Sequence, residues 1–527
     1  MLTKLSLNHY KAFEYASVNI KPITVLLGAN SVGKSSIIQL FLMLQQTGKA
    51  GLKSYKSALK LYGGYVNLGD SQNLFRKRDI TKPVILTFEI RNNVIKEFLK
   101  NEYFEAFSRI FTQLPMYIPI KGFSEIREKS IKNKEEFSKY LDLVIEVLSK
   151  TTIKDDIRNE ITWLLRHRHE IFIPQITKAN KREFVEIYEF LNDLSKKIKN
   201  DSFLIAYDLI LNKGNNLEIS KLTIRHNDIL ILEMNNQENL TIKSDLIKIG
   251  KQDEDEVRKL FLNENTIFNS FLPIRNDFSS EISLKASVVI QIINLFQNEI
   301  KKEFSEDSIN YVSPLRAHPK RYYMLDKAKL NLTLDTLDGD AIAEVLKDNK
   351  QITKSVNSWL RNFGVEVDVQ GFKEVIHHLL VRQNDINLDI TDVGFGISQI
   401  LPVIIQGFLS LKNTTTIIEQ PEIHLHPKMQ ADLADLFIDI VKKANGKKLI
   451  IETHSEYLLK RLRRRISEGV ISPDDVSICL FNPQTKDSGA TIDNLEIEEK
   501  GFFDWPVDFY GGEILKDTTE FLKNQSS

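Results

Sequence analysis

The most restrictive stretch of this sequence is GANSVGKSS at residues 28–36. Two glycines with four residues between them, followed by a lysine and a hydroxyl residue, form the pattern of a phosphate-binding loop. In such a loop the backbone N–H groups surround a β-phosphate, Lys34 reaches the β- and γ-phosphate oxygens, and the Ser35 hydroxyl ligates Mg²⁺. Residues 23–27 predict the strand before the loop, and residues 36–44 predict the helix whose N-terminus faces the phosphates. The sequence therefore predicts a nucleoside triphosphate site formed by Gly28, Ala29, Asn30, Ser31, Val32, Gly33, Lys34, Ser35 and Ser36.

The composition restricts the partners and the compartment that suit this chain. Its 527 residues are enough for about two to four domains, and 71 basic residues balance 71 acidic ones. Because there is no net charge to attract nucleic acid, a DNA contact would need a local basic patch. The single cysteine, Cys479, excludes a disulfide or a thiolate zinc site within the chain. Residues 1–13 lack the apolar core of a signal peptide, and the apolar run 400–411 is too short for a bilayer, so we expect a cytoplasmic protein with no membrane partner.

Hydrophobic periodicity divides the chain into regions of different secondary structure. Residues 92–200 are rich in Lys and Glu and follow a helical pattern, whereas residues 203–250 alternate like antiparallel strands. A helix is predicted over 284–304, and a strand follows it at INYVSPLR. The strands predicted before residue 92 are 3–8, 16–20, 23–27 and 84–91.

Two apolar strands in the last third of the chain end in residues that suit phosphate chemistry. In TTTIIEQPEIHLHP, the predicted strand 415–418 brings Glu419 to its C-terminal end, where an acid can hold Mg²⁺ opposite Ser35. KLIIETHS is a second apolar strand, predicted to end in His454, which can touch a γ-phosphate. The sequence thus supplies an acid and a histidine for the predicted phosphate site.

The segment TDVGFGISQILP, at residues 391–402, precedes these strands. Gly394 and Gly396 permit a close backbone approach, and Ser398 is predicted to open a helix with Pro402 near its first turn. We expect this second helix N-terminus to face an anion.

Together, these motifs resemble the nucleotide-binding head of the ABC-type ATPases. The resemblance is to the SMC, RecF and overcoming-lysogenisation-defect (OLD) class rather than to the transporters. The residues that carry it are 28–36 for the Walker A motif, 417–419 for Walker B, 394–399 for the signature motif, 424–427 for the D-loop, His454 for the switch histidine and Gln72 for the Q-loop.

The sequences of three further segments resemble those of stand-alone bacterial AAA ATPases, many of which are encoded in anti-phage defence operons. These segments are YVSPLRAHPKRYY, EQPEIHLHP and the C-terminal tail with its Trp-Pro pair and aromatic residues. The resemblance covers about residues 1–90 and 305–527, and nothing in 93–300 adds to it.

The resemblance implies an α/β fold in which a mixed sheet flanked by helices forms an ABC-type P-loop ATPase head with a helical and β-rich insertion. The implied parts of the chain are residues 1–92 with Walker A, an insertion at 93–304, the rest of the head at 305–498, and an aromatic tail at 499–527.

In this family the signature motif acts in trans, so that two heads enclose two nucleotides. The resemblance therefore implies ATP and Mg²⁺ as cofactors and a homodimer, alone or within a larger oligomer. It adds Gln72, Gly394, Gly396, Ser398 and Gln399 to the nucleotide contacts, and it assigns Mg²⁺ to Ser35, Gln72 and Glu419.

One residue departs from the family pattern. The position after the Walker B acid is usually a glutamate that polarises the attacking water, and here it is Gln420. An amide can orient water but cannot accept its proton. Either Glu422 or His454 supplies the base, or hydrolysis is slow and the ATP-bound dimer is a long-lived state; we favour slow but non-zero hydrolysis.

Several other residue groups have two interpretations. His424 and His426 have the spacing of a metal pair, but the absence of companion ligands makes a metal site the weaker interpretation. The arginine run at 461–465 is either a solvated helix face, which we favour, or a DNA or partner contact. Arg316 and Arg321 contact nucleotide or the dimer face, or they are structural. The tail aromatics either pack on the head or form a docking segment: Phe502, Phe503, Trp505, Phe509 and Tyr510.

A nuclease within this chain is not expected. Relatives of the OLD type carry a metal-dependent Toprim nuclease after the head, and the 73 residues after His454 are too few for it. The acids in that stretch form no DxD pair at a strand end: Asp474, Asp475, Asp487 and Asp493.

Three functions therefore remain. The first is an ATPase that senses a signal or scaffolds a separate effector protein, a nuclease or toxin, in anti-phage defence. The second is a RecF-like clamp that binds DNA in its ATP-bound form. The third is a nucleotide-locked structural module with negligible turnover, which Gln420 makes plausible.

Overall fold

The computed structural model describes residues 1–49, 57–102, 133–149, 178–236, 239–259, 266–268, 283–305, 308–316, 318–324, 339–371, 376–443, 446–485, 488–504 and 512–525. The strands are β1 (Leu2–Tyr10), β2 (Phe13–Asn19), β3 (Ile23–Gly28), β4 (Val84–Arg91), β5 (Ser202–Leu211), β6 (Leu217–His226), β7 (Ile229–Asn235), β8 (Thr241–Lys243), β9 (Ile309–Val312), β10 (Tyr323–Met324), β11 (Val365–Gly371), β12 (Ile376–Gln383), β13 (Ile386–Asp389), β14 (Thr415–Glu419), β15 (Lys448–Glu452), β16 (Val476–Asn482) and β17 (Thr491–Leu495). The α-helices are α1 (Lys34–Gly48), α2 (Asn93–Glu97), α5 (Lys134–Ser149), α7 (Lys181–Lys197), α8 (Lys251–Lys259), α9 (Leu284–Glu303), α10 (Gly339–Asp348), α11 (Lys350–Leu360), α12 (Phe395–Leu409), α13 (Pro427–Lys443), α14 (Glu456–Ser467) and α15 (Gly512–Gln525). The short helices are η1 (Ser71–Leu74), η2 (Arg76–Arg78), η3 (Phe98–Glu102), η4 (Arg361–Phe363), η5 (Ile390–Asp392) and η6 (Pro473–Asp475).

A six-stranded sheet carries the predicted motifs, in the order β17-β16-β3-β15-β14-β9. Its strands pair in parallel except for β17, which is antiparallel to β16. The phosphate-loop strand β3 lies inside the sheet between β16 and β15. Because β3, β15 and β14 run in the same direction, their carboxyl ends meet at one edge, where ligands bind in open α/β sheets.

A seven-stranded antiparallel sheet has the order β2-β1-β4-β5-β6-β7-β8. It joins strands from the first 91 residues to strands beyond residue 201, with Arg91 opposite Ser202 at one end of the β4–β5 ladder. The Asn494 side chain links this sheet to the first one, because it donates to the Ser17 carbonyl at 2.9 Å and accepts from the Asn19 amide at 3.0 Å. The sheet therefore crosses the sequence boundary predicted at residue 93.

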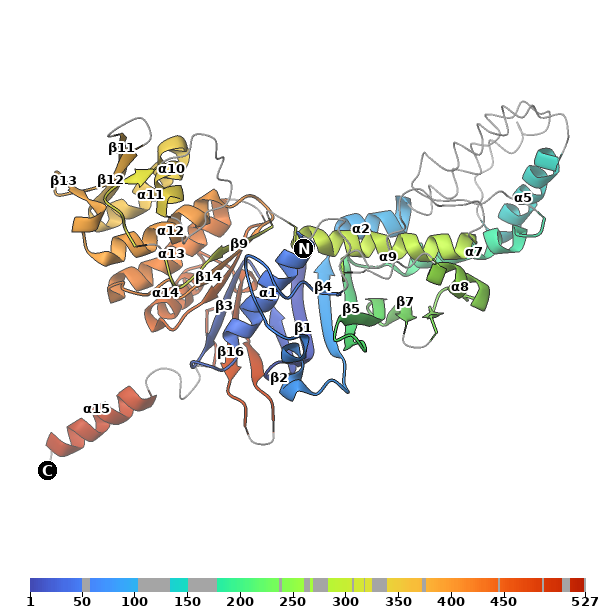
Figure 1. Cartoon of the computed structure of the whole chain (residues 1–527), viewed down its shortest axis with the longest axis horizontal. Coiled ribbons are helices and arrows are strands. Elements are labelled where there is room, and N and C mark those ends of the chain that lie inside the picture. The colour runs from blue at the N-terminus through green and yellow to red at the C-terminus, as the bar shows by residue number, and fades with distance from the viewer. Residues whose placement is uncertain are drawn as a thin grey trace.

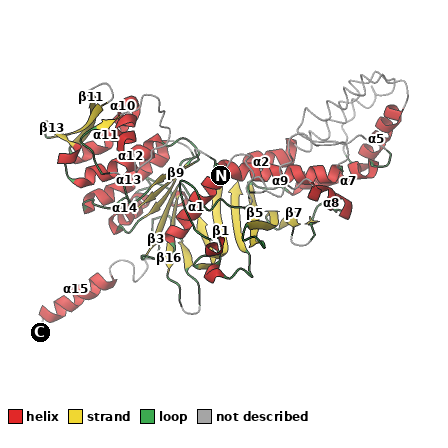
Figure 2. Cartoon of the chain, in the orientation of Figure 1, coloured by secondary structure: helices red, strands yellow, loops and turns green. Residues whose placement is uncertain are grey.

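Helices cover both faces of the six-stranded sheet, and strand β3 shows why (Figure 2). Ile23, Val25 and Leu27 belong to a core formed with α12, α13 and α14. Leu26, on the opposite face of the strand, belongs to a second core with α1 and the seven-stranded sheet. A strand buried on both faces reads as a continuous apolar run, as this one does. The predicted α/β fold with mixed sheets flanked by helices is confirmed.

Two extensions leave this central body (Figure 1). On one side an arm contains α2, α5, α7, α8 and α9, and α7 packs on α9. At the other end α15 projects from the body. A small sheet of β10, β11, β12 and β13 lies beside α10 and α11. Within the described ranges, every helix is too short or too polar to cross a lipid bilayer.

The elements match the sequence predictions with two corrections. The predicted strands 3–8, 16–20, 23–27 and 84–91 are present, as is the predicted helix 284–304. The helix predicted to open at Ser398 instead begins at Phe395, and Pro402 lies in its interior. The backbone can enter the helix early because Gly394 supplies the extended residue before it, with φ −54° and ψ 138°. The strand predicted to end in His454 ends at Glu452.

Candidate nucleotide site

The phosphate loop connects the end of β3 to the start of α1. Gly28 has φ +146°, and Gly33, which caps α1, has φ +106°. A β-carbon on Gly28 would lie 2.7 Å from the Phe481 carbonyl oxygen, and one on Gly33 would lie 2.6 Å from the Phe13 ring. Helix α1 starts with no capping side chain and no acidic residue in its first turn. Its N-terminus is therefore free to attract an anion.

The Lys34 side chain is folded into this loop. Its ammonium donates to the carbonyls of Gly28 at 2.9 Å and Ala29 at 2.7 Å. It also lies 3.5 Å from the Glu452 carboxylate, and both side chains are almost fully buried. Burial lowers the pKa of Lys34, and Glu452 is the largest influence that opposes this shift. Ser35 is exposed next to Lys34, as a magnesium ligand must be.

Glu419 lies at the end of β14, directly across the β14–β15 ladder from Glu452. Tyr311, on the neighbouring strand β9, donates to a Glu419 carboxylate oxygen at 2.6 Å. Burial raises the pKa of Glu419 to about 7, against the Tyr311 hydrogen bond, which lowers it. Glu419 and the Ser35 hydroxyl are oxygen donors of the kind that Mg²⁺ prefers, so these residues fit the implied metal.

Glu422 is hydrogen-bonded to the segment that carries His454. Glu422 accepts from the His454 amide at 2.6 Å and from the Thr453 hydroxyl at 2.8 Å. Both of its carboxylate oxygens are therefore engaged, and burial raises its pKa. Burial, followed by the Lys34 charge, lowers the pKa of His454, and the buried Nε2 atom of this side chain has no hydrogen-bond partner among the described residues. A neutral imidazole with a free nitrogen can contact a phosphate or water.

Arg316 is a structural residue that connects two of the predicted motifs. Its guanidinium is 6% exposed and donates to the carbonyl of Gln399 at 3.1 Å and to those of Glu419 and Gln420 at 2.9 and 3.2 Å. Burial lowers its pKa to about 10. Arg321, by contrast, forms an exposed ion pair with Asp392 at 2.8 Å.

An Arg316→Ala protein should lose about 3 kcal/mol of unfolding free energy, because three buried carbonyls lose their donor and a cavity remains. Urea denaturation measures the loss. The control, Arg321→Ala, should change stability by only about 0.5 kcal/mol because its ion pair is exposed. Equal effects of the two substitutions would contradict this role for Arg316.

The signature-like segment adjoins the predicted D-loop within the same chain. A β-carbon on Gly396 would lie 2.9 Å from the His424 carbonyl oxygen, whereas one on the exposed Gly394 would meet nothing within 4 Å. Ser398 and Gln399 are buried, at 6% and 4% exposure. The accessible part of this segment is thus its Gly394 end.

The remaining candidate residues are placed as follows. The Gln72 side chain, in η1, has no recorded hydrogen bond to the phosphate loop among the described residues. His426 accepts from the Lys428 amide at 3.3 Å, and no cluster of three or more His, Cys, Asp or Glu side chains suited to a metal ion lies within the described residues. Phe503 is 8% exposed, and Trp505, Phe509, Tyr510 and Asp487 lie outside the described residues.

The arginine run on α14 is paired with acids. Arg461 contacts Asp432 at 3.0 Å and Asp435 at 2.6 Å, and Arg465 also contacts Asp435 at 2.6 Å. Arg464 pairs with Glu468 at 2.7 Å. The pairs of Arg461 and Arg465 with Asp432 and Asp435 join α14 to α13, whereas the Arg464 pair lies at the end of α14 itself, so three of the four arginines in the run face acids.

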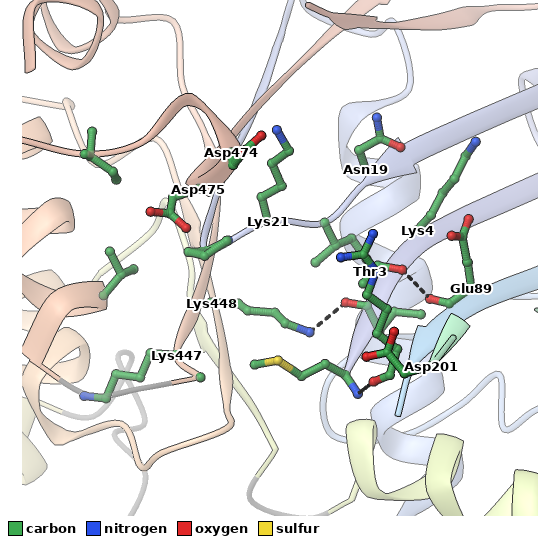
Figure 3. A pocket seen from close by; sticks show the side chains of 18 of the residues that line it. Thr3, Lys4, Asn19, Lys21, Glu89, Asp201, Lys447, Lys448, Asp474 and Asp475 are labelled. Carbon is green, nitrogen blue, oxygen red and sulfur yellow. Dashed lines mark hydrogen bonds between the residues drawn. The ribbon is translucent and has the colours of Figure 1, made fainter. Parts of the chain in front are cut away.

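A cavity of about 1070 Å³ lies at the opposite, amino edge of the six-stranded sheet (Figure 3). Three of the lysines that line it are bound within the protein: Lys448 donates to the Leu2 carbonyl at 2.7 Å, Lys447 to the Gly407 carbonyl at 3.1 Å and Lys21 to the Pro473 carbonyl at 3.1 Å. We assign it no ligand.

Sequence reasoning missed Glu452, Tyr311 and the structural role of Arg316. A signal for Glu452 was present, because KLIIE repeats the pattern of TTIIE, an apolar strand that ends in glutamate. Nothing comparable marks Tyr311, whose role depends on the β9–β14 register.

Comparisons with known proteins complete the description of the site. Among solved structures, the chain is similar to the SMC head domain from Thermotoga maritima, with 8% identity, a TM-score of 0.34, and coverage of 94% of this chain and 99% of that one. It is also similar to the Smc head domain with a coiled coil and joint from Pyrococcus yayanosii, with 9% identity, a TM-score of 0.34, and coverage of 98% and 99%. We base no inference on similarities of this strength. No curated protein matches the sequence. The model of the AAA ATPase domain family matches residues 1–459, and the chain belongs to that family.

Proposed function

We propose that this AAA ATPase binds ATP with Mg²⁺, dimerises around it as an ABC-type head, and hydrolyses it slowly to control a separate effector protein. The observation that carries the proposal is the meeting of three strand ends. Lys34 follows β3, Glu419 ends β14 and His454 follows β15, all at the carboxyl edge of one sheet. An ammonium, a carboxylate and a free imidazole nitrogen suit phosphate, a divalent cation and water.

We propose the roles of these residues as follows. The loop 28–36 holds the phosphates, Ser35 and Glu419 ligate Mg²⁺, and His454 contacts the γ-phosphate. Gln420 orients the attacking water without taking its proton, which makes turnover slow. Glu422 is the weaker candidate base, because both of its oxygens already accept hydrogen bonds.

In the proposed dimer, the signature-like helix α12 meets the nucleotide of the second copy. Gly394, the exposed N-cap of α12, would face the second copy, while the buried Ser398 and Gln399 lie in the interior of this segment. A substitution at Ser398 would test the fold rather than the interface, because that residue is buried. Gly394 offers a cleaner test, since a side chain there meets nothing within 4 Å and its φ is negative.

A Gly394→Arg protein should remain folded and bind ATP within about twofold of wild type, because the substitution lies on the surface. It should stay monomeric with ATP, because the long cation obstructs the second copy. Light scattering with and without ATP measures this. The matched control is Gly64→Arg, at another exposed glycine with open space around it, which should dimerise normally. ATP-dependent dimers of Gly394→Arg would count against the sandwich.

The defence role and the effector, a nuclease or toxin, are proposals that rest on the resemblance of the motifs. Co-purification from the native host, followed by mass spectrometry, tests them with wild type and with a variant that cannot bind ATP. A DNA clamp of the RecF kind is less favoured, because three of the four arginines in the run on α14 are paired with Asp432, Asp435 and Glu468. Salt-dependent DNA binding by the ATP-bound protein would reverse that preference.

A further inference from the structure

A second buried carboxylate lies beside the proposed magnesium ligand. Glu452 and Glu419 are register partners on the parallel strands β15 and β14. Register partners in a sheet face the same side, so the two carboxyl groups are neighbours, and the Glu452 charge raises the pKa of Glu419 in addition to the larger effect of burial. Glu452 is 4% exposed, so water cannot stabilise its charge.

Lys34 is the cation that lies beside this pair of carboxyl groups. Its ammonium lies 3.5 Å from Glu452 and is turned onto the carbonyls of its own loop. A bound triphosphate needs the same ammonium for its β- and γ-oxygens. Glu452 and the phosphates therefore compete for Lys34.

When Lys34 turns to the phosphates, two neighbouring carboxyl groups are left facing a polyanion. Two negative charges on neighbouring residues in a buried site repel strongly unless a proton or a cation lies between them. Among the largest influences on the pKa of Glu419, Lys34 contributes a positive charge and Tyr311 a neutral hydroxyl. A divalent cation is the ligand that would restore the balance.

We propose that Glu452 is a positioning residue of the nucleotide site, which pairs with Lys34 beside the loop and, with Glu419, makes nucleotide binding depend on a divalent cation. This inference rests on the proposed function.

The test is the affinity for ATP with EDTA and with Mg²⁺, measured by calorimetry for wild type and Glu452→Gln. Wild type should bind weakly without metal and about 100-fold more tightly with it. Glu452→Gln should bind metal-free ATP about tenfold more tightly than wild type, because Lys34 is released and one negative charge is gone. Its gain from Mg²⁺ should shrink about tenfold for the same reason.

Two further variants define the outcomes. Glu468→Gln removes a carboxylate from the far end of α14 and should behave as wild type. Glu452→Asp keeps the charge but moves it away from Lys34, so its metal-free affinity should lie between those of wild type and Glu452→Gln. If Glu452→Gln does not fold, Glu452→Asp provides the test instead. If the folded Glu452 variant gains as much ATP affinity from Mg²⁺ as wild type does, the inference is overturned. If wild type binds ATP neither with EDTA nor with Mg²⁺, the proposed function itself is overturned.

Discussion

A Lys34→Ala protein should bind ATP about 100-fold more weakly than wild type, because it loses the charge-assisted hydrogen bonds that the ammonium makes to phosphate oxygens. Hydrolysis should fall below detection. The Lys34 ammonium already lies inside the loop, almost fully buried between the loop carbonyls and Glu452, so alanine leaves the loop without this cation. Calorimetric titration with ATP and Mg²⁺ measures the affinity, and phosphate release measures the turnover.

The same substitution also leaves Glu452 without its ion pair, so loss of binding must be separated from loss of folding. Lys447→Ala is the matched control, since Lys447 is a buried lysine at the opposite edge of the same sheet, bonded to the Gly407 carbonyl. It should lower the melting temperature without changing ATP affinity. Normal ATP binding by folded Lys34→Ala would refute the nucleotide site.

A Gln420→Glu protein should hydrolyse ATP about tenfold or more faster than wild type, because a carboxylate at this position can accept the proton of the attacking water. Gln420 follows Glu419 at the mouth of the site, and its backbone is fixed by a 2.8 Å bond from its amide to the Glu452 carbonyl. The exchange of amide for carboxylate changes the side chain while the backbone stays held. Steady-state phosphate release gives kcat and KM.

The control for this gain is the double variant Lys34→Ala, Gln420→Glu, which should be inactive if the added turnover occurs at the same site. An unchanged kcat in Gln420→Glu would mean that another group already acts as base. Absence of turnover in wild type, with a gain in Gln420→Glu, would favour the nucleotide-locked module instead.

The sequence predicted strands β3, β9, β14 and β15 of the six-stranded sheet because they are short apolar runs, and it missed β16 and β17. Gly28 and Glu419 each close a predicted strand, and the structure has β3 and β14 ending at those residues. Periodicity also predicted the antiparallel strands beyond residue 203. It could not predict that they extend the sheet of β1, β2 and β4, because strand pairing across a long insertion leaves no local pattern.

The candidate site was predicted less completely than the fold. Local sequence patterns predict the phosphate loop and Glu419, but they do not predict which side chains are buried. Ser398, which the resemblance gives as a nucleotide contact, is buried in the structure. Helix α12 begins earlier than predicted because a glycine does not by itself end a helix. Arg316 had two interpretations that only its contacts with the Gln399, Glu419 and Gln420 carbonyls could separate.

The way the arm joins the body has a consequence for how such proteins diversify. The chain leaves β4 and re-enters at β5 as hydrogen-bonded neighbours, with Arg91 opposite Ser202 and the Asn92 amide 2.8 Å from the Asp201 carbonyl. Entry and exit are thus as close as the two ends of a hairpin. A different lobe, or a tight turn, can bridge the same strands without disturbing their order, so the insertion can be exchanged or shortened while both sheets keep their strand order.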